Sequence, residues 1–196
     1  MKIHPRQIGF DIDGVVADTV EAFIRLARRD YGIESLTPAD ITEFEVEKCL
    51  DLQPTIIQEI FAALLVDPLA AALKPLPDAV AVLTEFARLA PLTFITARPQ
   101  KPPIAAWLTD ILGQDIFADA RLIAMGDHDN KAAFIKKMGL DYFVDDRAQT
   151  CVRLDQEGIT PMVFSQPWNR GRHRLRTVNN WREIRQLCFA DGEAPL

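Results

Sequence analysis

The stretch QIGFDIDGVVAD, residues 7–18, joins a short apolar run directly to two aspartates and a glycine. The run at 7–10 predicts a buried strand that ends at Asp11, with Asp13 two residues later. In open sheets of parallel strands, ligands bind beyond the carboxyl ends of the strands. The two carboxylates therefore predict a site at that edge. Gly14 serves the turn that follows, where a side chain would crowd the backbone.

Four more short apolar runs follow, and segments with helical patterning separate them. We predict strands over 92–95, 122–124, 142–144 and 161–164. We predict helices over 78–89, 103–112, 131–138 and 148–157. The strands lack polar alternation, as is typical of strands buried on both faces. Short strands separated by helices of this length indicate an α/β protein with a parallel sheet and right-handed crossovers.

One stretch, from 15 to 75, shows helical patterning and no strand candidate. Its signals are helices over 20–31 and 54–66, a stop at Gly32 and a start at Thr37-Pro38. A simple crossover needs only about 10–12 residues. We therefore expect an all-helical cap at 16–74, inserted after the first strand, and a core formed by 1–15 and 75–196. The alternative is that these helices pack on the sheet as ordinary crossover helices.

Polar residues also follow the other strands of the expected sheet. They are Thr96 and Arg98, with Ala97 between them, then Lys131 at a helix start, then Asp145, Asp146 and Arg147. A parallel sheet brings them to the same edge as the first two aspartates. Clustered carboxylates raise each other's pKa unless a cation neutralises them. Mg²⁺ prefers a few carboxylates, retained waters and a phosphate oxygen. The pattern predicts Mg²⁺ and a phosphorylated ligand that Thr96 and Lys131 would clamp.

Four motifs in this order, GFDIDGVVAD (9–18), FITARP (94–99), Lys131 and YFVDDR (142–147), resemble those of the haloacid-dehalogenase (HAD) superfamily of phosphatases. The resemblance implies a Rossmann-like core, a cap and a Mg²⁺-dependent phosphomonoesterase. It implies that Asp11 is the nucleophile that forms an aspartyl-phosphate. It further implies that Asp13 is the general acid for the leaving alcohol and then the base for water.

The same resemblance assigns the remaining site residues. It implies phosphate binding by Thr96, Ala97 and Lys131, and metal binding by Asp11, the carbonyl of Asp13, Asp145 and Asp146. We expect Asp146 to be the direct metal ligand and Asp145 its water-mediated neighbour. An acid two residues after the nucleophile allows water to be activated, a step worth roughly 10²–10⁴-fold in rate.

Further features resemble the cytosolic type C 5′(3′)-deoxyribonucleotidases and imply a (deoxy)nucleoside monophosphate as substrate. They are ITARP before a proline-rich helix start, the return LPDA (76–79) and the late QPWNR (166–170). That family commonly has an aromatic residue after DGVxAD that sandwiches the base, whereas this chain has Thr19. Phe23 and Phe44 are candidate stacking surfaces, and core packing is the alternative for both. Arg98, Thr19 and Phe44 are the substrate-binding candidates.

Composition and charge exclude or disfavour several classes of protein. The chain has 196 residues, a net charge of −6 and 48% hydrophobic residues, which excludes intrinsic disorder and disfavours a nucleic-acid partner. Three scattered cysteines without a CxxC pair fit a reducing cytoplasm. The longest apolar run, 60–66, is far shorter than the ~20 residues of a membrane helix. We expect a soluble cytoplasmic protein, and a homodimer remains open.

Several alternatives remain open at this point. Arg98 and Arg147 can touch phosphate or pair with the aspartates. The segment 169–185 holds six arginines against one glutamate, and either forms structural ion pairs or steers anionic substrates, with Arg170 as the residue of interest. The rival functions are a phosphatase of sugar phosphates or other small metabolites, and a catalytically silent HAD-like binding module. Asp129 or Asn130 is expected to cap the helix that Lys131 begins.

Overall fold

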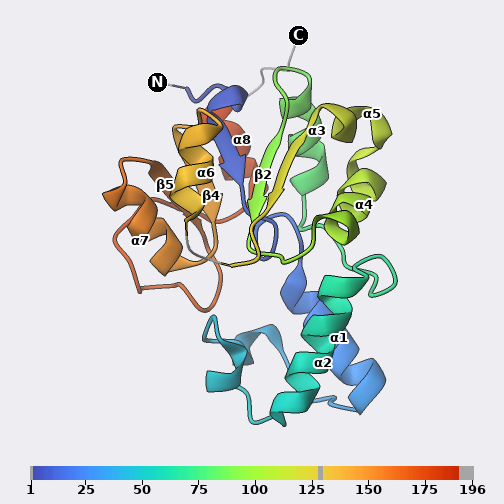
Figure 1. Cartoon of the computed structure of the whole chain (residues 1–196). Helices are drawn as coiled ribbons and strands as arrows, with labels where there is room; N and C mark the ends of the chain where they lie inside the picture. The colour runs from blue at the N-terminus through green and yellow to red at the C-terminus, as the bar shows by residue number, and fades with distance from the viewer. Residues whose placement is uncertain (1, 128–129, 190–196) are drawn as a thin grey trace.

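The computed structural model describes residues 2–127 and 130–189 and contains one six-stranded sheet in the order β3-β2-β1-β4-β5-β6 (Figure 1). The strands are β1 (Ile8–Phe10), β2 (Thr93–Thr96), β3 (Arg121–Ala124), β4 (Tyr142–Asp145), β5 (Thr160–Phe164) and β6 (Thr177–Val178). Every neighbouring pair is parallel. The predicted Rossmann-like α/β architecture is therefore confirmed, and β1 lies between β2 and β4 near the centre.

Helices cover both faces of this sheet. They are α3 (Ala79–Ala87), α4 (Lys101–Leu112), α5 (Gln114–Asp119), α6 (Lys131–Lys137), α7 (Ala148–Gln156) and α8 (Trp181–Cys188). Successive strand residues face opposite sides. Accordingly, Phe10 packs against Phe86 of α3 and Trp181 of α8, with ring centroids 6.2 and 5.1 Å away. Phe143 instead joins a second buried cluster with Ile135 of α6 on the opposite face.

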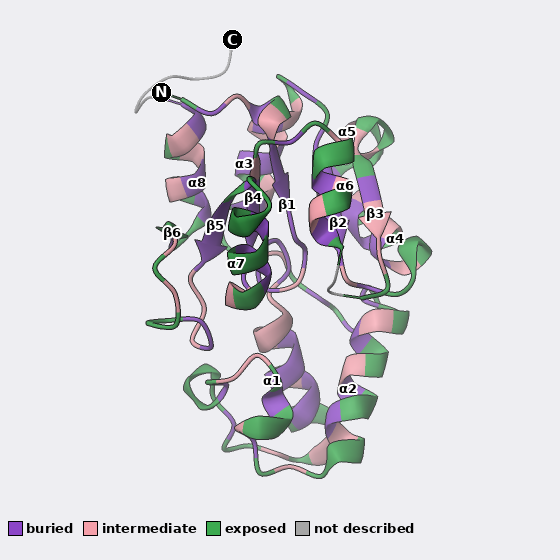
Figure 2. Ribbon diagram, turned by 60° about the vertical axis from the view of Figure 1, so that its left-hand side comes forward, coloured by how far each residue is buried: buried purple, intermediate pink, exposed green. Residues whose placement is uncertain are grey.

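The segment between β1 and α3 leaves the sheet. Its helices α1 (Thr19–Tyr31) and α2 (Pro54–Val66) pack on each other beyond the carboxyl edge of the sheet, where short 3₁₀ turns join them (Figures 1 and 2). The predicted helices over 20–31 and 54–66 are confirmed, and the alternative that they cover the sheet is wrong. Gly32 ends α1 with φ 67°, the left-handed conformation that glycine adopts readily. Thr37 begins only the 3₁₀ turn Pro38–Asp40.

Two chain crossings connect this helical segment to the sheet, and they pair with each other. The Asp18 N–H donates to the Lys74 carbonyl over 2.8 Å, and the Leu76 N–H donates to the Val16 carbonyl over 2.7 Å. Trp107 of α4 adds a bond from its indole N–H to the Leu73 carbonyl. These contacts support a boundary at 16–74, and we propose that this range is the cap.

Among the strands and α-helices of the described residues, sequence patterns missed three: β6, α5 and α8. A two-residue strand and a six-residue helix are too short to show a periodicity. Helix α8 begins inside the basic segment 169–185 and ends beyond it, and arginines stand between the buried residues Trp181, Ile184 and Cys188. Asn130 precedes α6 but makes no side-chain cap, and Asp129 lies outside the described residues. No helix in the described part of the chain is long and apolar enough to cross a membrane.

Candidate active site

The charged centre lies at the carboxyl edge of the sheet, where β1, β2 and β4 end. Asp11 follows β1, Thr96 is the last residue of β2, and Asp145 is the last residue of β4. Lys131, only 3% exposed, points its Nζ to 2.6 Å from Asp145 Oδ2 and 3.3 Å from Asp11 Oδ1. One carboxylate oxygen each of Asp11, Asp145 and Asp146 lies within 4.8 Å of the others. The structure thus brings the sequence-predicted residues together.

Burial and the neighbouring negative charges disfavour the ionised forms of the carboxyl groups at this centre when no cation is bound. Burial, together with the charges of Asp145 and Asp13, raises the pKa of Asp11 to about 7, although Lys131 opposes the shift. Burial and the Asp145 charge also raise the pKa of Asp146. Burial would lower the pKa of Lys131, but the carboxylates of Asp11 and Asp145 outweigh it and raise that pKa. One buried ammonium therefore faces more carboxylate charge than it can neutralise.

The donor set fits a hard divalent cation. All its side-chain donors are carboxylate oxygens, the ligands that Mg²⁺ prefers. Asp11 Oδ1 is buried, and the contact described for it is the 3.3 Å ion pair with Lys131 Nζ, without a well-formed hydrogen bond among the described residues. Both oxygens of Asp145 are occupied, Oδ2 by Lys131 and Oδ1 by the Arg147 N–H. This agrees with Asp146 as the more direct ligand, and that assignment remains a prediction.

The turn at 166–169 forms hydrogen bonds to Asp146 and to Gly14 beside it. Trp168 Nε1 donates to Asp146 Oδ2 over 3.1 Å, and Asn169 Nδ2 donates to the Asp146 carbonyl over 2.7 Å. Gln166 Nε2 donates to the Gly14 carbonyl over 2.7 Å. Gly14 has φ 70°, and a Cβ there would lie 2.5 Å from Asp146 Oδ2, so a glycine is required. The turn fixes the backbone and side chain of Asp146 together.

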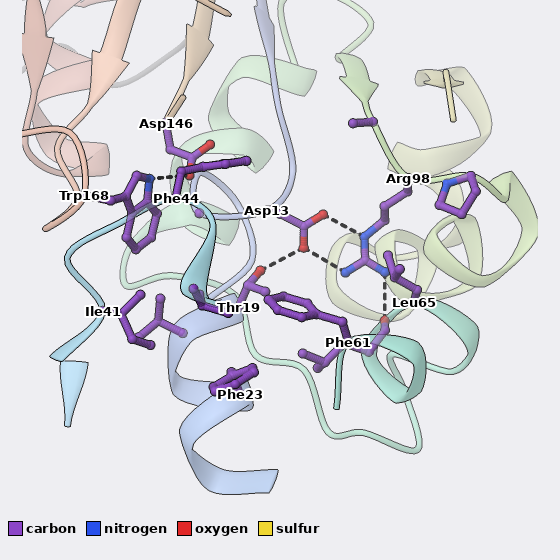
Figure 3. A pocket seen from close by; sticks show the side chains of 16 residues that line it. Asp13, Thr19, Phe23, Ile41, Phe44, Phe61, Leu65, Arg98, Asp146 and Trp168 are labelled. Carbon is purple, nitrogen blue, oxygen red and sulfur yellow. Dashed lines mark hydrogen bonds and ion pairs between the residues drawn. The ribbon is translucent and has the colours of Figure 1, made fainter. Parts of the chain in front are cut away.

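Asp13 is held on the cap side of the centre. Arg98 binds it through two parallel bonds of 2.8 Å, from Nε to Oδ2 and from Nη2 to Oδ1 (Figure 3). Thr19 Oγ1 also donates to Asp13 Oδ1 over 2.8 Å. Burial would raise the pKa of Asp13, but the guanidinium outweighs it and lowers that pKa. Of the two alternatives for Arg98, the structure shows pairing with an aspartate.

A cavity of about 280 Å³ opens between cap and core (Figure 3). Its polar end contains Asp13, Thr19, Arg98 and Asp146, next to Ala97. The rest of its lining is apolar, with Phe23, Phe44, Phe61 and Trp168 among Val20, Ile41, Val46, Leu64, Leu65 and Pro99. Both stacking candidates, Phe23 and Phe44, face this cavity.

Two of the cavity's aromatic residues, Phe61 and Trp168, were not identified as lining residues from the sequence. Phe61 looks like an ordinary helix-packing side chain, and it does pack on Phe23 with ring centroids 5.3 Å apart. Trp168 could have been found through the QPWNR motif. The Arg147 guanidinium lies over the Phe44 ring, 4.9 Å from the centroid, and no pairing with an aspartate is found for it among the described residues, whereas its contact with phosphate stays a prediction.

Residues 5–192 match the family model described as 5′ nucleotidase, deoxy (pyrimidine), cytosolic type C protein. The chain belongs to this family. As a member of the type C nucleotidase family it is a phosphoric monoester hydrolase, and the predicted enzyme class is confirmed. A comparison with curated proteins found no match.

Solved HAD-superfamily structures share the fold of this nucleotidase-family protein. A HAD family hydrolase from Deinococcus radiodurans, with bound phosphate and sodium, aligns with a TM-score of 0.61 at 13% identity, covering 95% of this chain and 99% of that one. CbbY from Rhodobacter sphaeroides, in complex with xylulose-1,5-bisphosphate, gives 0.56 at 16% identity, covering 90% and 95%. A haloacid dehalogenase-like hydrolase from Streptococcus pneumoniae gives 0.57 at 14% identity, covering 90% and 95%. The predicted HAD-type fold is confirmed.

Proposed function

We propose that this enzyme is a Mg²⁺-dependent 5′(3′)-(deoxy)nucleotidase that works through an aspartyl-phosphate on Asp11. The observation that carries the proposal is the cavity that joins the charged centre to an apolar space with four aromatic side chains in its wall. A phosphate ester fits only if its phosphoryl group lies at the polar end and its leaving group in the apolar space. The family name supports action on cytoplasmic nucleotides.

The apolar lining favours a nucleobase over a sugar as the leaving-group moiety. A nucleobase offers flat faces that aromatic side chains bind well, by roughly 1–3 kcal/mol per stacked base. A sugar phosphate would bring several hydroxyl groups into this space. Each hydroxyl buried without a hydrogen bond costs about 1–3 kcal/mol. Among the described lining residues, polar side chains lie only where the phosphoryl group would bind.

In the first step, an Asp11 oxygen attacks phosphorus and the bond from phosphorus to the leaving oxygen breaks. Lys131 and the Thr96 hydroxyl would bind the phosphoryl oxygens. Asp13 would give a proton to the leaving oxygen, and it must first take that proton up against the pairing with Arg98 that lowers its pKa. In the second step, water attacks phosphorus, Asp13 takes its proton, and the bond to Asp11 breaks. Splitting one displacement into two easier steps is the advantage of a covalent intermediate.

Asp11, the Asp13 carbonyl, Asp145 and Asp146 would hold the metal ion. When bound, Mg²⁺ supplies the positive charge that keeps the Asp11 carboxyl ionised and offsets charge on the phosphoryl group. The raised pKa of Asp11, about 7 without a metal, supports this need for a cation. The turn at 166–169 orients Asp146 for the same purpose.

Turnover of a phosphate-ester panel tests the proposal. The panel contains nucleoside 5′- and 3′-monophosphates, their deoxy forms, sugar phosphates and small metabolite phosphates, each with and without Mg²⁺. We expect Mg²⁺-dependent turnover of the nucleotides, lowered on the order of 10⁴-fold or more in Asp11→Asn. Faster turnover of sugar phosphates would instead favour the small-metabolite phosphatase. No turnover across the panel by a folded protein would favour the silent module.

A further inference from the structure

Arg98 connects the core to the cap through a single buried side chain. It follows β2 by two residues and is 3% exposed. All three of its nitrogens donate within the protein. Nε and Nη2 bind the two oxygens of Asp13, and Nη1 donates to the Leu64 carbonyl of α2 over 2.8 Å. Figure 3 shows this chain of contacts from Asp13 through Arg98 toward α2.

The Leu64 carbonyl can accept the hydrogen bond from Arg98 Nη1 because it lies near the C-terminal end of α2. It lies in the last turn of α2, where carbonyls have no partner within the helix. The helix C-terminus also carries partial negative charge, which favours a cation. The binding site of the guanidinium is therefore built from two parts, the Asp13 carboxylate of the core and a main-chain carbonyl of the cap.

The bidentate ion pair with Arg98 sets the orientation of the Asp13 carboxylate. A guanidinium that binds a carboxylate through two parallel bonds fixes the plane of that carboxylate, which a lysine ammonium does not. If the cap moves away, Nη1 loses its acceptor and water reaches the pair. Solvent weakens an ion pair that is strong when buried. The orientation of Asp13 then depends on whether the end of α2 is in place.

We propose that Arg98 is a positioning residue that aims the Asp13 carboxyl at the leaving oxygen only when the end of α2 is docked on the core. The proposal rests on the acid–base role of Asp13 in the proposed function. It deepens that function by linking closure over the substrate to proton transfer. Arg98 acts through Asp13, because two of its three guanidinium nitrogens donate to the Asp13 carboxylate and the third donates to the Leu64 carbonyl.

Leaving-group dependence distinguishes positioning from a general structural role. The measurement is kcat/KM for a series of aryl phosphates of decreasing leaving-group acidity, ending with a nucleoside monophosphate. The variant Arg98→Lys keeps the positive charge but cannot form the bidentate pair. For it we expect kcat/KM on the nucleotide to fall by about 10²-fold. On nitrophenyl phosphate, whose leaving group needs little protonation, we expect a loss of less than about 10-fold.

The matched control is Arg172→Lys. Arg172 also binds the cap, but its bonds among the described residues go to Glu43 and the Thr42 carbonyl, not to Asp13 or α2. We expect this variant to leave the slope of log kcat/KM against leaving-group acidity unchanged. An equal loss on every substrate in Arg98→Lys would overturn the proposal, since partial unfolding or poor packing lowers all rates alike. Nucleotide turnover by the parent and its loss in Asp11→Asn test the proposed function separately.

Hydrogen exchange tests the cap contact without any turnover. In Arg98→Lys we expect faster exchange, by roughly 10-fold, of the amides in the last turn of α2 and of Asp67, with exchange in β1 and β4 unchanged. In Arg172→Lys we expect faster exchange near Glu43 instead. Unchanged exchange at the end of α2 in Arg98→Lys would show that the contact does not hold the cap, and would overturn the proposal.

Discussion

The two ends of the active-site cavity are built from different parts of the fold and by different forces. At the polar end, the cavity is lined by Asp13, Arg98 and Asp146, which follow strands of one sheet, and the ion-paired cluster of Asp11, Lys131 and Asp145 lies beside them. At the leaving-group end, most of the apolar wall comes from the cap, through side chains such as Phe23 and Phe61. Under the proposed function, reaction chemistry and substrate choice would therefore reside in separate segments of this chain. Changes at the two ends should therefore affect different measurable quantities.

Lys131→Met should have the largest effect, because it removes the ammonium from the buried carboxylates. Removing one partner of a buried ion pair costs about 3–5 kcal/mol of stability. Without Mg²⁺, we expect the free energy of unfolding, measured by denaturant titration, to fall by that amount. We also expect nearly complete loss of phosphatase activity. Saturating Mg²⁺ should restore part of the stability and none of the activity. Full activity in this variant would contradict the assignment of Lys131 to the phosphoryl group.

Trp168→Phe tests a residue that contacts both ends of the cavity, because its ring lines the apolar space and its indole N–H donates to Asp146. It keeps an aromatic face in the cavity but removes the donor to Asp146 Oδ2. Loss of a hydrogen bond that orients a metal ligand typically costs 10–100-fold in metal affinity. We expect the Mg²⁺ concentration for half-maximal activity to rise by about 10-fold or more, with KM for the nucleotide changed less. An unchanged Mg²⁺ requirement with a raised KM would place the role of Trp168 entirely at the leaving-group end.

Phe61→Leu weakens the leaving-group end alone. It shortens an aromatic side chain of α2 that packs on Phe23, far in sequence from the charged centre. Because stacking on a base contributes roughly 1–3 kcal/mol, KM for nucleotides should rise by about 10-fold while the Mg²⁺ requirement stays constant. Turnover of a small acyl phosphate, which has no base to stack, is the control and should change little. Equal losses on both substrates would show a folding defect instead.

Arg172→Ala should have the smallest effect. Its pairing with Glu43 is exposed to solvent, with side chains 48% and 34% exposed, and exposed pairs contribute little to stability. We expect less than about a threefold change in kcat/KM, and a difference from the parent that shrinks as salt is added. A large, salt-independent loss would mean that the cap depends on Arg172 more than on the buried contact of Arg98.

The charged end of the site could be predicted from the sequence because its residues directly follow strands. A strand, an aspartate and a glycine form a local pattern, and a parallel sheet then brings Asp11, Thr96 and Asp145 to one edge. The phosphate, metal and catalytic roles of these residues remain predictions. The basic segment is partly explained, since Arg172, Arg182 and Arg185 pair with Glu43, Asp78 and Glu85, as expected for structural ion pairs.

The contacts between cap and core could not be predicted in the same way. The acceptor for Arg98 is a main-chain carbonyl, which exists at every position and leaves no signature in the sequence. Phe61 shows the same helical spacing as a core residue, because it packs on Phe23 and lines the cavity at once. Such contacts depend on how two separate segments meet, which no local pattern encodes.

The use of a main-chain carbonyl at Leu64 also affects how this enzyme can change over evolution. Replacing the side chain at position 64 leaves the carbonyl in place, so the bond from Arg98 persists as long as α2 ends there. If Arg98 positions Asp13 as proposed, substitutions on the inward face of α2 would alter the preferred leaving group without releasing Asp13. Substrate preference would then evolve in the cap while the geometry of proton transfer is conserved.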